Sequence, residues 1–297
     1  MSPLALVGPT ASGKSRAAGQ IARRRGDIEI VAIDAFTVYR GMDVATAKPT
    51  AEERAEVPHH LVDVLDPDEE LTVAQFQVLA RDAIAAVRGR GRVPLLVGGS
   101  GLYFRAVVDD LRFPPTDPGV RAGLEKRYRD DPEGAHATLR RLDPRAAEGI
   151  APENLRRTVR ALEVLELTGE PFSAFATAWD EHVSIYPDLE VAYLEPEPAA
   201  LRAAIADRAR AMVEEGLMEE AAALRRGPGL SRTAAQAIGY AEAFAVLDGT
   251  LAEEELAGAI ATRTWRFAKR QRGWFRADPR CTPVDAGTAV GRLAKPS

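Results

Sequence analysis

The chain of 297 residues contains one cysteine, Cys281, and four histidines. A single thiol cannot form a disulfide within the chain, and a thiolate zinc cluster is excluded for the same reason. His59 and His60 are adjacent, so in regular structure their side chains would point in different directions. The N-terminus has neither a basic segment nor a long apolar run, so we expect a cytoplasmic protein that is not secreted and does not span a membrane.

A surplus of positive charge is also missing, because 39 basic residues face 44 acidic ones and leave a net charge of −5. This balance argues against nucleic acid as a partner, since phosphate contacts need basic residues. The charge is uneven, however. Residues 262–276, TRTWRFAKRQRGWFR, contain arginines and a lysine but no acid, with tryptophans and phenylalanines between them. Such a run suits a phosphate backbone with stacked bases, and equally a solvated helix face whose aromatics pack on the core.

The chain begins with a pattern that is typical of a phosphate loop. Residues 8–15, GPTASGKS, fit G-x-x-x-x-G-K-[ST], between an expected strand over 3–7 and an expected helix over 14–25. The loop glycines permit close backbone approach, and the helix N-terminus adds partial positive charge. The alternative is an ordinary strand–turn–helix corner. We expect phosphate binding, with Mg²⁺ on the last residue, by Gly8, Pro9, Thr10, Ala11, Ser12, Gly13, Lys14 and Ser15.

Strands and helices alternate through the first hundred residues, which predicts an α/β fold with a parallel sheet. We expect strands over 28–33 and 93–97, and a helix that Thr72 opens with a capping box to Gln75. After the proline-rich stretch that begins at Phe113, the chain reads as helical and charged, with helices over 119–142 and 154–168.

A strand over 191–194 and helices over 199–215, 231–247 and 251–276 complete the expected elements, with Thr250 and Glu253 capping the last helix. We expect the tail after Asp278 to be loosely ordered. The prediction is therefore a P-loop NTPase-like α/β core over 1–112 and 188–297, with an all-helical insertion over 113–187.

The third expected strand lacks the acid that an ATPase or GTPase uses to position its magnesium ion, since it ends in Gly98-Gly99-Ser100-Gly101. Small-molecule kinases often place a substrate-binding acid at the end of the second strand, where Asp34 stands. Asp34 would either take a proton from an attacking group or cap a turn. The residues themselves thus indicate a phosphate-loop transferase and leave the transferred group open.

Further motifs occur in a fixed order along nearly the whole chain. After GPTASGKS come IDAFTVYRGMDVATAKP (33–49), HHLVD (59–63), GGSGLY (98–103), LRRTVRALEV (155–164), RARAMVEEGL (208–217), QAIGY (236–240) and the basic stretch 262–276. Together these resemble the tRNA dimethylallyltransferase family in its bacterial form. The usual D-S-x-Q of that family reads Asp34-Ala35-Phe36-Thr37 here, and Ala241 stands where a lysine or arginine is common.

The resemblance implies that the loop holds the diphosphate of dimethylallyl diphosphate, which leaves when the dimethylallyl group passes to the exocyclic amine of an adenosine. That adenosine lies just 3′ of the anticodon in tRNAs reading codons that begin with U. The family's catalytic residues map onto Asp34 as base, onto Lys14 and Arg208 at the diphosphate, and onto Ser100 in place of a threonine. The implied contacts with the anticodon stem-loop are Ile33, Asp34, Ala35, Phe36, Thr37, Ser100, Arg156, Arg157, Arg160, Arg266, Lys269 and Arg270.

Three other functions remain open at this stage: prenylation of free adenine nucleotides, a small-molecule kinase that consumes ATP, and a nucleotide-controlled module that binds RNA without altering it. We expect no membrane partner and no obligate protein partner, so the chain should act as a monomer.

Overall fold

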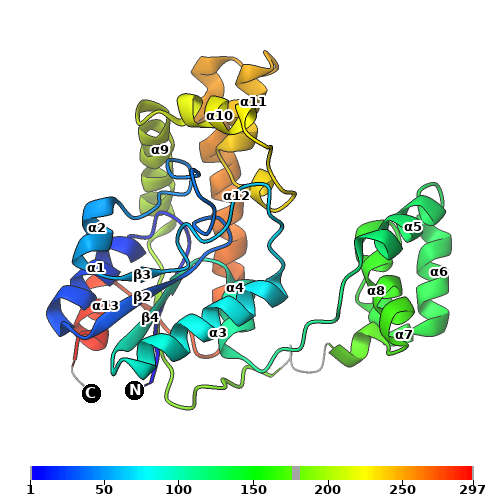
Figure 1. The fold of residues 1–297 in the computed structure, drawn as a ribbon, viewed down its shortest axis with the longest axis horizontal. Helices are drawn as coiled ribbons and strands as arrows, with labels where there is room; N and C mark the ends of the chain where they lie inside the picture. Colours follow the sequence, from blue (N-terminus) through cyan, green and yellow to red (C-terminus); the bar gives the residue numbers. More distant parts are fainter. Residues whose placement is uncertain (1, 176–180, 296–297) are drawn as a thin grey trace. The chain divides into compact units, whose positions relative to one another are not determined.

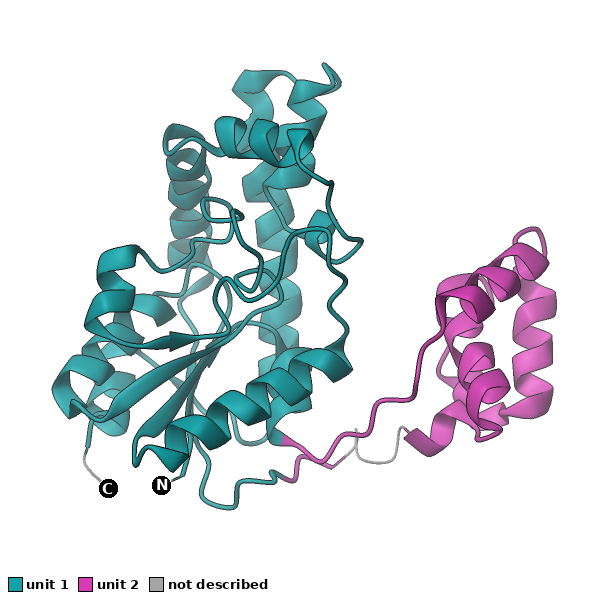
Figure 2. Cartoon of the chain, in the orientation of Figure 1, with its two compact units in different colours: residues 1–108, 184–297 teal, residues 109–183 magenta. Residues whose placement is uncertain are grey.

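The computed structural model describes residues 2–175 and 181–295, and it consists of two compact units (Figure 2). Unit 1 comprises residues 1–108 and 184–297, and unit 2 comprises residues 109–183. The boundaries read from the sequence, at 113 and 187, lie a few residues further along the chain. Part of the expected insertion, residues 176–180, lies outside the described residues.

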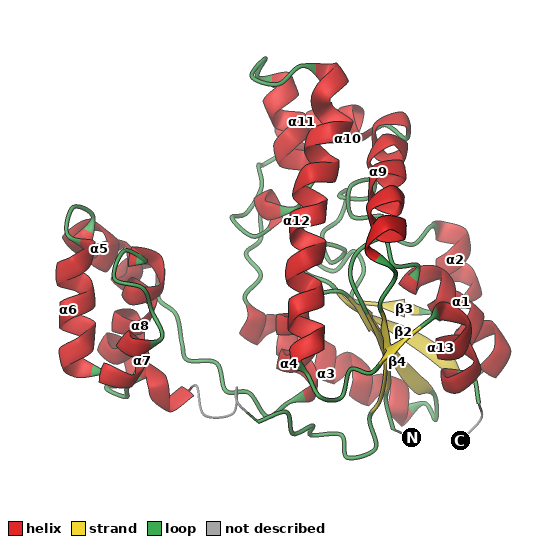
Figure 3. Ribbon diagram, turned by 180° about the vertical axis from the view of Figure 1, so that it is seen from behind, coloured by secondary structure: helices red, strands yellow, loops and turns green. Residues whose placement is uncertain are grey.

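Unit 1 is built on a six-stranded parallel sheet with the strand order β3-β2-β4-β1-β5-β6 (Figures 1 and 3). The expected parallel α/β core is thereby confirmed. The strands are β1 (Leu4–Val7), β2 (Ile28–Ile33), β3 (His59–His60), β4 (Val93–Gly98), β5 (Glu190–Leu194) and β6 (Pro283–Val284).

Both faces of the sheet are covered by helices, which explains why its central strands are apolar without interruption. On β1, Leu4 and Leu6 pack toward α1 (Lys14–Arg25) and α13 (Ala286–Leu293), whereas Ala5 and Val7 face the opposite core. That second core is completed by α3 (Val73–Gly89), α4 (Gly101–Val108), α9 (Pro198–Glu214), α10 (Leu217–Arg226), α11 (Tyr240–Leu247) and α12 (Leu256–Ala277). One short helix, α2 (Ala51–Glu56), precedes β3.

Several helix predictions for unit 1 were right and several were wrong. Thr72 opens α3 with the expected capping box to Gln75. The expected helix over 231–247 is a 3₁₀ turn followed by α11, because Gly239 at φ 109° interrupts it. The last long helix starts only at Leu256, and the Thr250 hydroxyl donates to the Ala245 carbonyl instead of capping it.

Residues 279–295 contain regular secondary structure, contrary to the expectation of a loosely ordered tail. This segment adds β6 to the edge of the sheet and then forms α13, whose Ala289, Val290 and Leu293 are buried against α1. Asp285 caps this helix by accepting from the Thr288 backbone N–H at 2.9 Å. An eight-residue amphipathic segment is too short for its period to stand out in the sequence.

Unit 2 contains only helices among its described residues, namely α5 (Pro118–Tyr128), α6 (Pro132–Leu142), α7 (Pro144–Glu148) and α8 (Leu155–Thr168), with a 3₁₀ turn over Phe172–Phe175. The single helix expected over 119–142 is two helices, because Pro132 ends the first and Asp131 caps the second. Its core surrounds Leu124, Leu139 and Leu162.

Candidate active site at the carboxyl edge of the sheet

The carboxyl ends of β1, β2, β4 and β5 meet at one edge of the sheet, because these strands are parallel and in register. The backbones are very close there. A Cβ on Gly98 would lie 2.2 Å from the Ile33 carbonyl oxygen, and one on Gly8 would lie 2.6 Å from the Leu194 carbonyl oxygen. Glycine is therefore needed at the ends of β1 and β4, and ligands of such sheets bind at this edge.

The phosphate loop links β1 to α1 as the sequence predicted. The Ser12 N–H donates to the Pro9 carbonyl at 3.3 Å, and two loop residues, Ala11 and Gly13, have φ values of 60° and 83°. This tight turn directs loop backbone toward a cavity of about 870 Å³. Thr10 to Ser15 line the cavity, whereas Gly8 and Pro9 are buried behind them.

Three of the charged residues that line this cavity come from different elements. Lys14 at the start of α1, Arg208 from α9 and Asp34 after β2 all line it. Desolvation and the nearby Arg208 lower the pKa of Lys14 to about 7, against the opposing effect of Asp34. Desolvation also lowers the pKa of Arg208. The Lys14 ammonium donates to the Pro9 carbonyl at 2.6 Å. A pair of cations that repel one another is a favourable setting for an anion.

The Asp34 carboxylate combines the two roles that the sequence left open. Its Oδ1 accepts from the backbone N–H groups of Phe36 at 2.8 Å and Thr37 at 3.4 Å, which makes an Asx turn. Its Oδ2 accepts no hydrogen bond from any residue that the structure describes. One oxygen thus fixes the side chain, and the other is available to a ligand.

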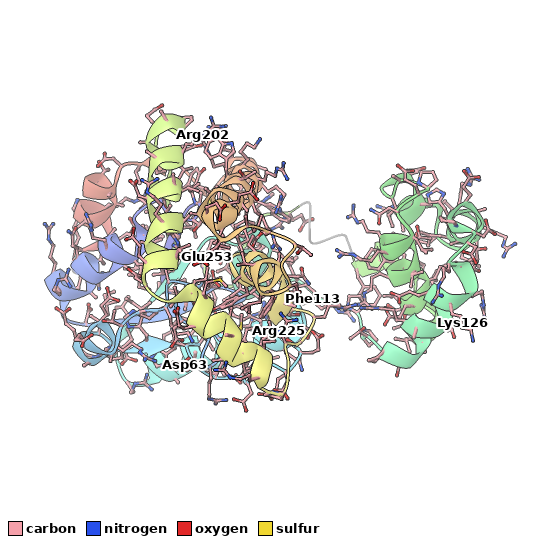
Figure 4. The ribbon with its side chains drawn as sticks, turned by 90° about the horizontal axis from the view of Figure 1, so that it is seen from above. Asp63, Phe113, Lys126, Arg202, Arg225 and Glu253 are labelled. Carbon is pink, nitrogen blue, oxygen red and sulfur yellow. The ribbon has the colours of Figure 1, made fainter. Side chains whose placement is uncertain are left out.

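The segment after Asp34 is held in place by a buried lysine. Lys48 donates to the Tyr39 carbonyl at 2.6 Å, to Asp63 at 2.6 Å and to Asp43. The carboxylate of Asp63, labelled in Figure 4, also accepts a hydrogen bond from the Arg54 guanidinium at 2.6 Å. These three acceptors stabilise the buried Lys48 ammonium. The YRGMD, TAKP and HHLVD motifs are thereby joined at one point.

Helix α12 has two chemically distinct faces. Thr264, Phe267 and Gln271 line the cavity together with Ala204, Arg208 and Met212 of α9. Helices α9 and α12 also contact each other through Arg202 of α9, labelled in Figure 4, whose guanidinium lies 4.7 Å from the ring centroid of Trp265 on α12.

The cationic side chains of α12 are not equivalent. Arg263 pairs with Glu242, and Arg272 and Arg276 pair with Glu195. By contrast, the structure gives no acidic partner, among the residues it describes, to three exposed side chains of the same helix: Arg266, Lys269 and Arg270. These are the residues that the sequence selected in this segment, and their charge is free for a ligand.

The other residues singled out in the sequence are distributed as follows. Phe36 and Thr37 line the cavity, but Ile33, Ala35 and Ser100 do not. The Ser100 hydroxyl accepts from the Tyr103 N–H at 3.4 Å at the start of α4. Arg156, Arg157 and Arg160 belong to unit 2, and their contact with tRNA stays a prediction.

Within unit 2, Arg160 already has internal partners. Its guanidinium donates to the carbonyls of Pro114 and Pro115, each at 2.8 Å, and to the buried Glu163 at 2.9 Å. Arg156 and Arg157 are exposed.

Sequence reasoning missed many of the residues that line the cavity, among them Arg16, Thr264, Phe267 and Gln271. Arg16 follows the loop directly, and its position in the first turn of α1 was a usable signal. The other three recur at 264, 267 and 271, a helical spacing that marks one face but does not reveal what that face covers.

A phosphate loop at a helix N-terminus, Lys14, Arg208 and the anchored Asp34 carboxylate lie around one cavity, which is the arrangement expected of a phosphate-loop transferase. The family model "IPP transferase" matches residues 37–278, and the chain belongs to that family.

Individual relatives agree with the family model. The tRNA dimethylallyltransferase of Bifidobacterium longum is 46% identical over 282 residues, which cover 93% of this chain and 84% of the relative. The enzyme of that name from Thermobifida fusca is 47% identical over 298 residues and is covered to 92%.

Solved structures show the same fold. The tRNA isopentenylpyrophosphate transferase from Bacillus halodurans has a TM-score of 0.71 at 39% identity, with 99% of this chain and 94% of that chain covered. A eukaryotic dimethylallyltransferase acting on tRNA has a TM-score of 0.79 at 26% identity, with 96% and 73% covered. No helix among the described residues is both long and apolar enough to cross a membrane.

Proposed function

We propose that this chain is a tRNA dimethylallyltransferase, which transfers the dimethylallyl group of dimethylallyl diphosphate to the N6 amine of an adenosine just 3′ of the anticodon. The observation that carries the proposal is the single cavity that the phosphate loop shares with the free Oδ2 side of Asp34. Such a cavity brings an anionic leaving group and a proton acceptor to one substrate, which a simple phosphate-binding loop does not require.

The donor's diphosphate would lie at residues 10–15. Negative charge grows on it as the allylic C–O bond lengthens, and the loop N–H groups, Lys14 and Arg208 oppose that charge. Ser15 lines the cavity, and its hydroxyl has no hydrogen-bond partner among the described residues, so Ser15 is the residue that would hold Mg²⁺ beside phosphate oxygens. When bound, the ion supplies further charge stabilisation of the leaving group.

The acceptor amine would lie near Asp34. Its nitrogen forms a bond to C1 of the dimethylallyl group while the C1–O bond breaks and its electron pair leaves with the diphosphate. The amine proton passes to Oδ2 of Asp34. Because the amine's lone pair is delocalised into the adenine ring, positioning and proton removal have to supply much of the rate.

The tRNA would meet unit 1 along the exposed cations of α12. An adenosine cannot react inside a base stack, so it has to be flipped into the cavity, where the Phe36 and Phe267 side chains offer aromatic surface. Arg156 and Arg157 of unit 2 are proposed as further contacts with the anticodon stem-loop. The expected substrates are tRNAs that read codons beginning with U. We also infer that the protein is cytoplasmic and that it is a monomer. Light scattering of the purified protein tests the monomeric state.

The decisive experiment is mass spectrometry of nucleosides from unmodified tRNA after incubation with the protein, Mg²⁺ and dimethylallyl diphosphate. We expect an adenosine that is heavier by one dimethylallyl group, located beside the anticodon. An unchanged adenosine with folded protein would reject the proposal. A parallel reaction with AMP tests the free nucleotide as acceptor, and one with ATP alone tests the kinase.

A further inference from the structure

Helix α12 provides the phosphate loop with a buried amide. Gln271 is only 5% exposed, and its Oε1 accepts the Thr10 backbone N–H at 2.9 Å. An N–H group can donate only to the oxygen of a carboxamide, so this contact fixes which way the amide is turned. The Nε2 group of Gln271 therefore points away from Thr10.

The Nε2 group lies beside the backbone of Gly99. A Cβ on Gly99, the residue after β4, would lie 2.5 Å from Nε2, so glycine at this position leaves room for the Gln271 amide. Nε2 donates to no residue that the structure describes, although Gln271 lines the cavity beside residues 10–15. The Nε2 group is therefore free to donate a hydrogen bond to a ligand in the cavity.

We propose that Gln271 is a diphosphate-binding residue, an inference that rests on the proposed function for the identity of the anion. Its Oε1 holds the tip of the phosphate loop through Thr10, and its Nε2 donates a hydrogen bond to a phosphate oxygen in the cavity. The Thr10 N–H is occupied by Gln271, so the amide replaces a loop donor with one that α12 provides. Lys14 and Arg208 supply charge to the anion, whereas Gln271 supplies a donor in a fixed direction.

The test measures the dissociation constant of inorganic diphosphate by titration calorimetry, in the presence of Mg²⁺. Gln271→Met removes both hydrogen bonds at similar volume. Gln271→Glu keeps the size and an acceptor for Thr10, but replaces the donor with a negative charge. We expect both variants to bind diphosphate about tenfold to a hundredfold more weakly, because hydrogen bonds to charged groups are the strong ones. The control is Gln77→Met on α3, whose amide donates to the Ala106 carbonyl at 2.7 Å away from the cavity and which should bind as the wild type does.

A wild-type dissociation constant for Gln271→Met, with an unchanged melting temperature, would overturn the assignment. If that variant fails to fold, Gln271→Glu decides in the same way. The wild-type protein offers a further readout that needs no folded variant, since the side-chain N–H resonances of Gln271 should shift when diphosphate is added. None of these measurements involves prenyl transfer. If the wild-type protein bound diphosphate but left tRNA unmodified, the proposed function would be rejected, whereas the assignment of Gln271 as a diphosphate-binding residue would stand.

Discussion

The two oxygens of the Asp34 carboxylate have different surroundings, and this difference allows its chemical role to be separated from its structural one. Asn at this position keeps an acceptor for the Phe36 N–H but cannot take a proton. We expect Asp34→Asn to lower the single-turnover rate of tRNA modification by about 10²–10⁴-fold, which is the usual range for a general base. Affinity for tRNA, measured by filter binding, should change by less than about threefold.

Asp34→Ala is the matched comparison, because it also removes the turn. It should lower the rate at least as far and additionally weaken tRNA binding. If Asp34→Asn lost rate and affinity in parallel, Asp34 would be a binding residue and not a base.

The second prediction at this scale concerns the charge of Lys14. Burial and Arg208 lower its pKa to about 7, so in the free protein the ammonium loses its proton as the pH rises through that value. A bound diphosphate favours the charged form and raises the pKa again. Diphosphate affinity should therefore fall above pH 7, and binding at about pH 8 should take up protons.

Calorimetry in two buffers of different ionisation enthalpy measures this proton uptake. The control is Lys14→Arg, because a guanidinium stays protonated and leaves only the titration of the diphosphate itself. Equal uptake by the two proteins would show that Lys14 does not titrate in this range.

At the scale of elements, α12 carries paired and unpaired cations on the same 22-residue helix. Replacing Arg266, Lys269 and Arg270 by Gln should weaken tRNA binding and flatten its dependence on salt. Each lost phosphate contact reduces the slope of log K against log salt by about 0.7–0.9. Arg276→Gln is the control on the same helix, because Glu195 already holds that guanidinium. A triple variant with an unchanged slope would remove this face from the RNA site.

The elements also show what could be read from the sequence. Local signals were sufficient for the phosphate loop, for the central strands and for the Thr72 capping box, because each depends on residues close together in the chain. They failed for β6 and α13, whose stability comes from packing on β5 and α1. They also could not find Gln271, since its partner Thr10 is 261 positions away. The family resemblance supplied the role of Asp34, which its position alone left open.

At the scale of the whole molecule, the helical unit is inserted between two neighbouring points of unit 1. The Ile185 N–H and the Ser184 hydroxyl donate to the Val108 carbonyl at 2.8 and 3.1 Å. Unit 2 has its own core around Leu139. A short Gly-Ser linker can therefore replace residues 109–183 without straining the sheet.

We expect the protein with this replacement to fold, to bind diphosphate with wild-type affinity and to lose most of its affinity for tRNA. Calorimetry and filter binding measure the two. Retained tRNA affinity would mean that unit 2 is not part of the RNA site. Loss of diphosphate binding would mean that the phosphate loop depends on it.

The hydrogen bond from Thr10 to Gln271 also has a consequence for biosynthesis. The side chain that holds the phosphate loop is synthesised 261 positions after Thr10. β6 and α13, which cover β5 and α1, are made later still. A nascent chain can thus form most of its sheet during translation while its active site remains incomplete. Premature termination before residue 271 should therefore yield a protein whose phosphate loop lacks this hydrogen bond.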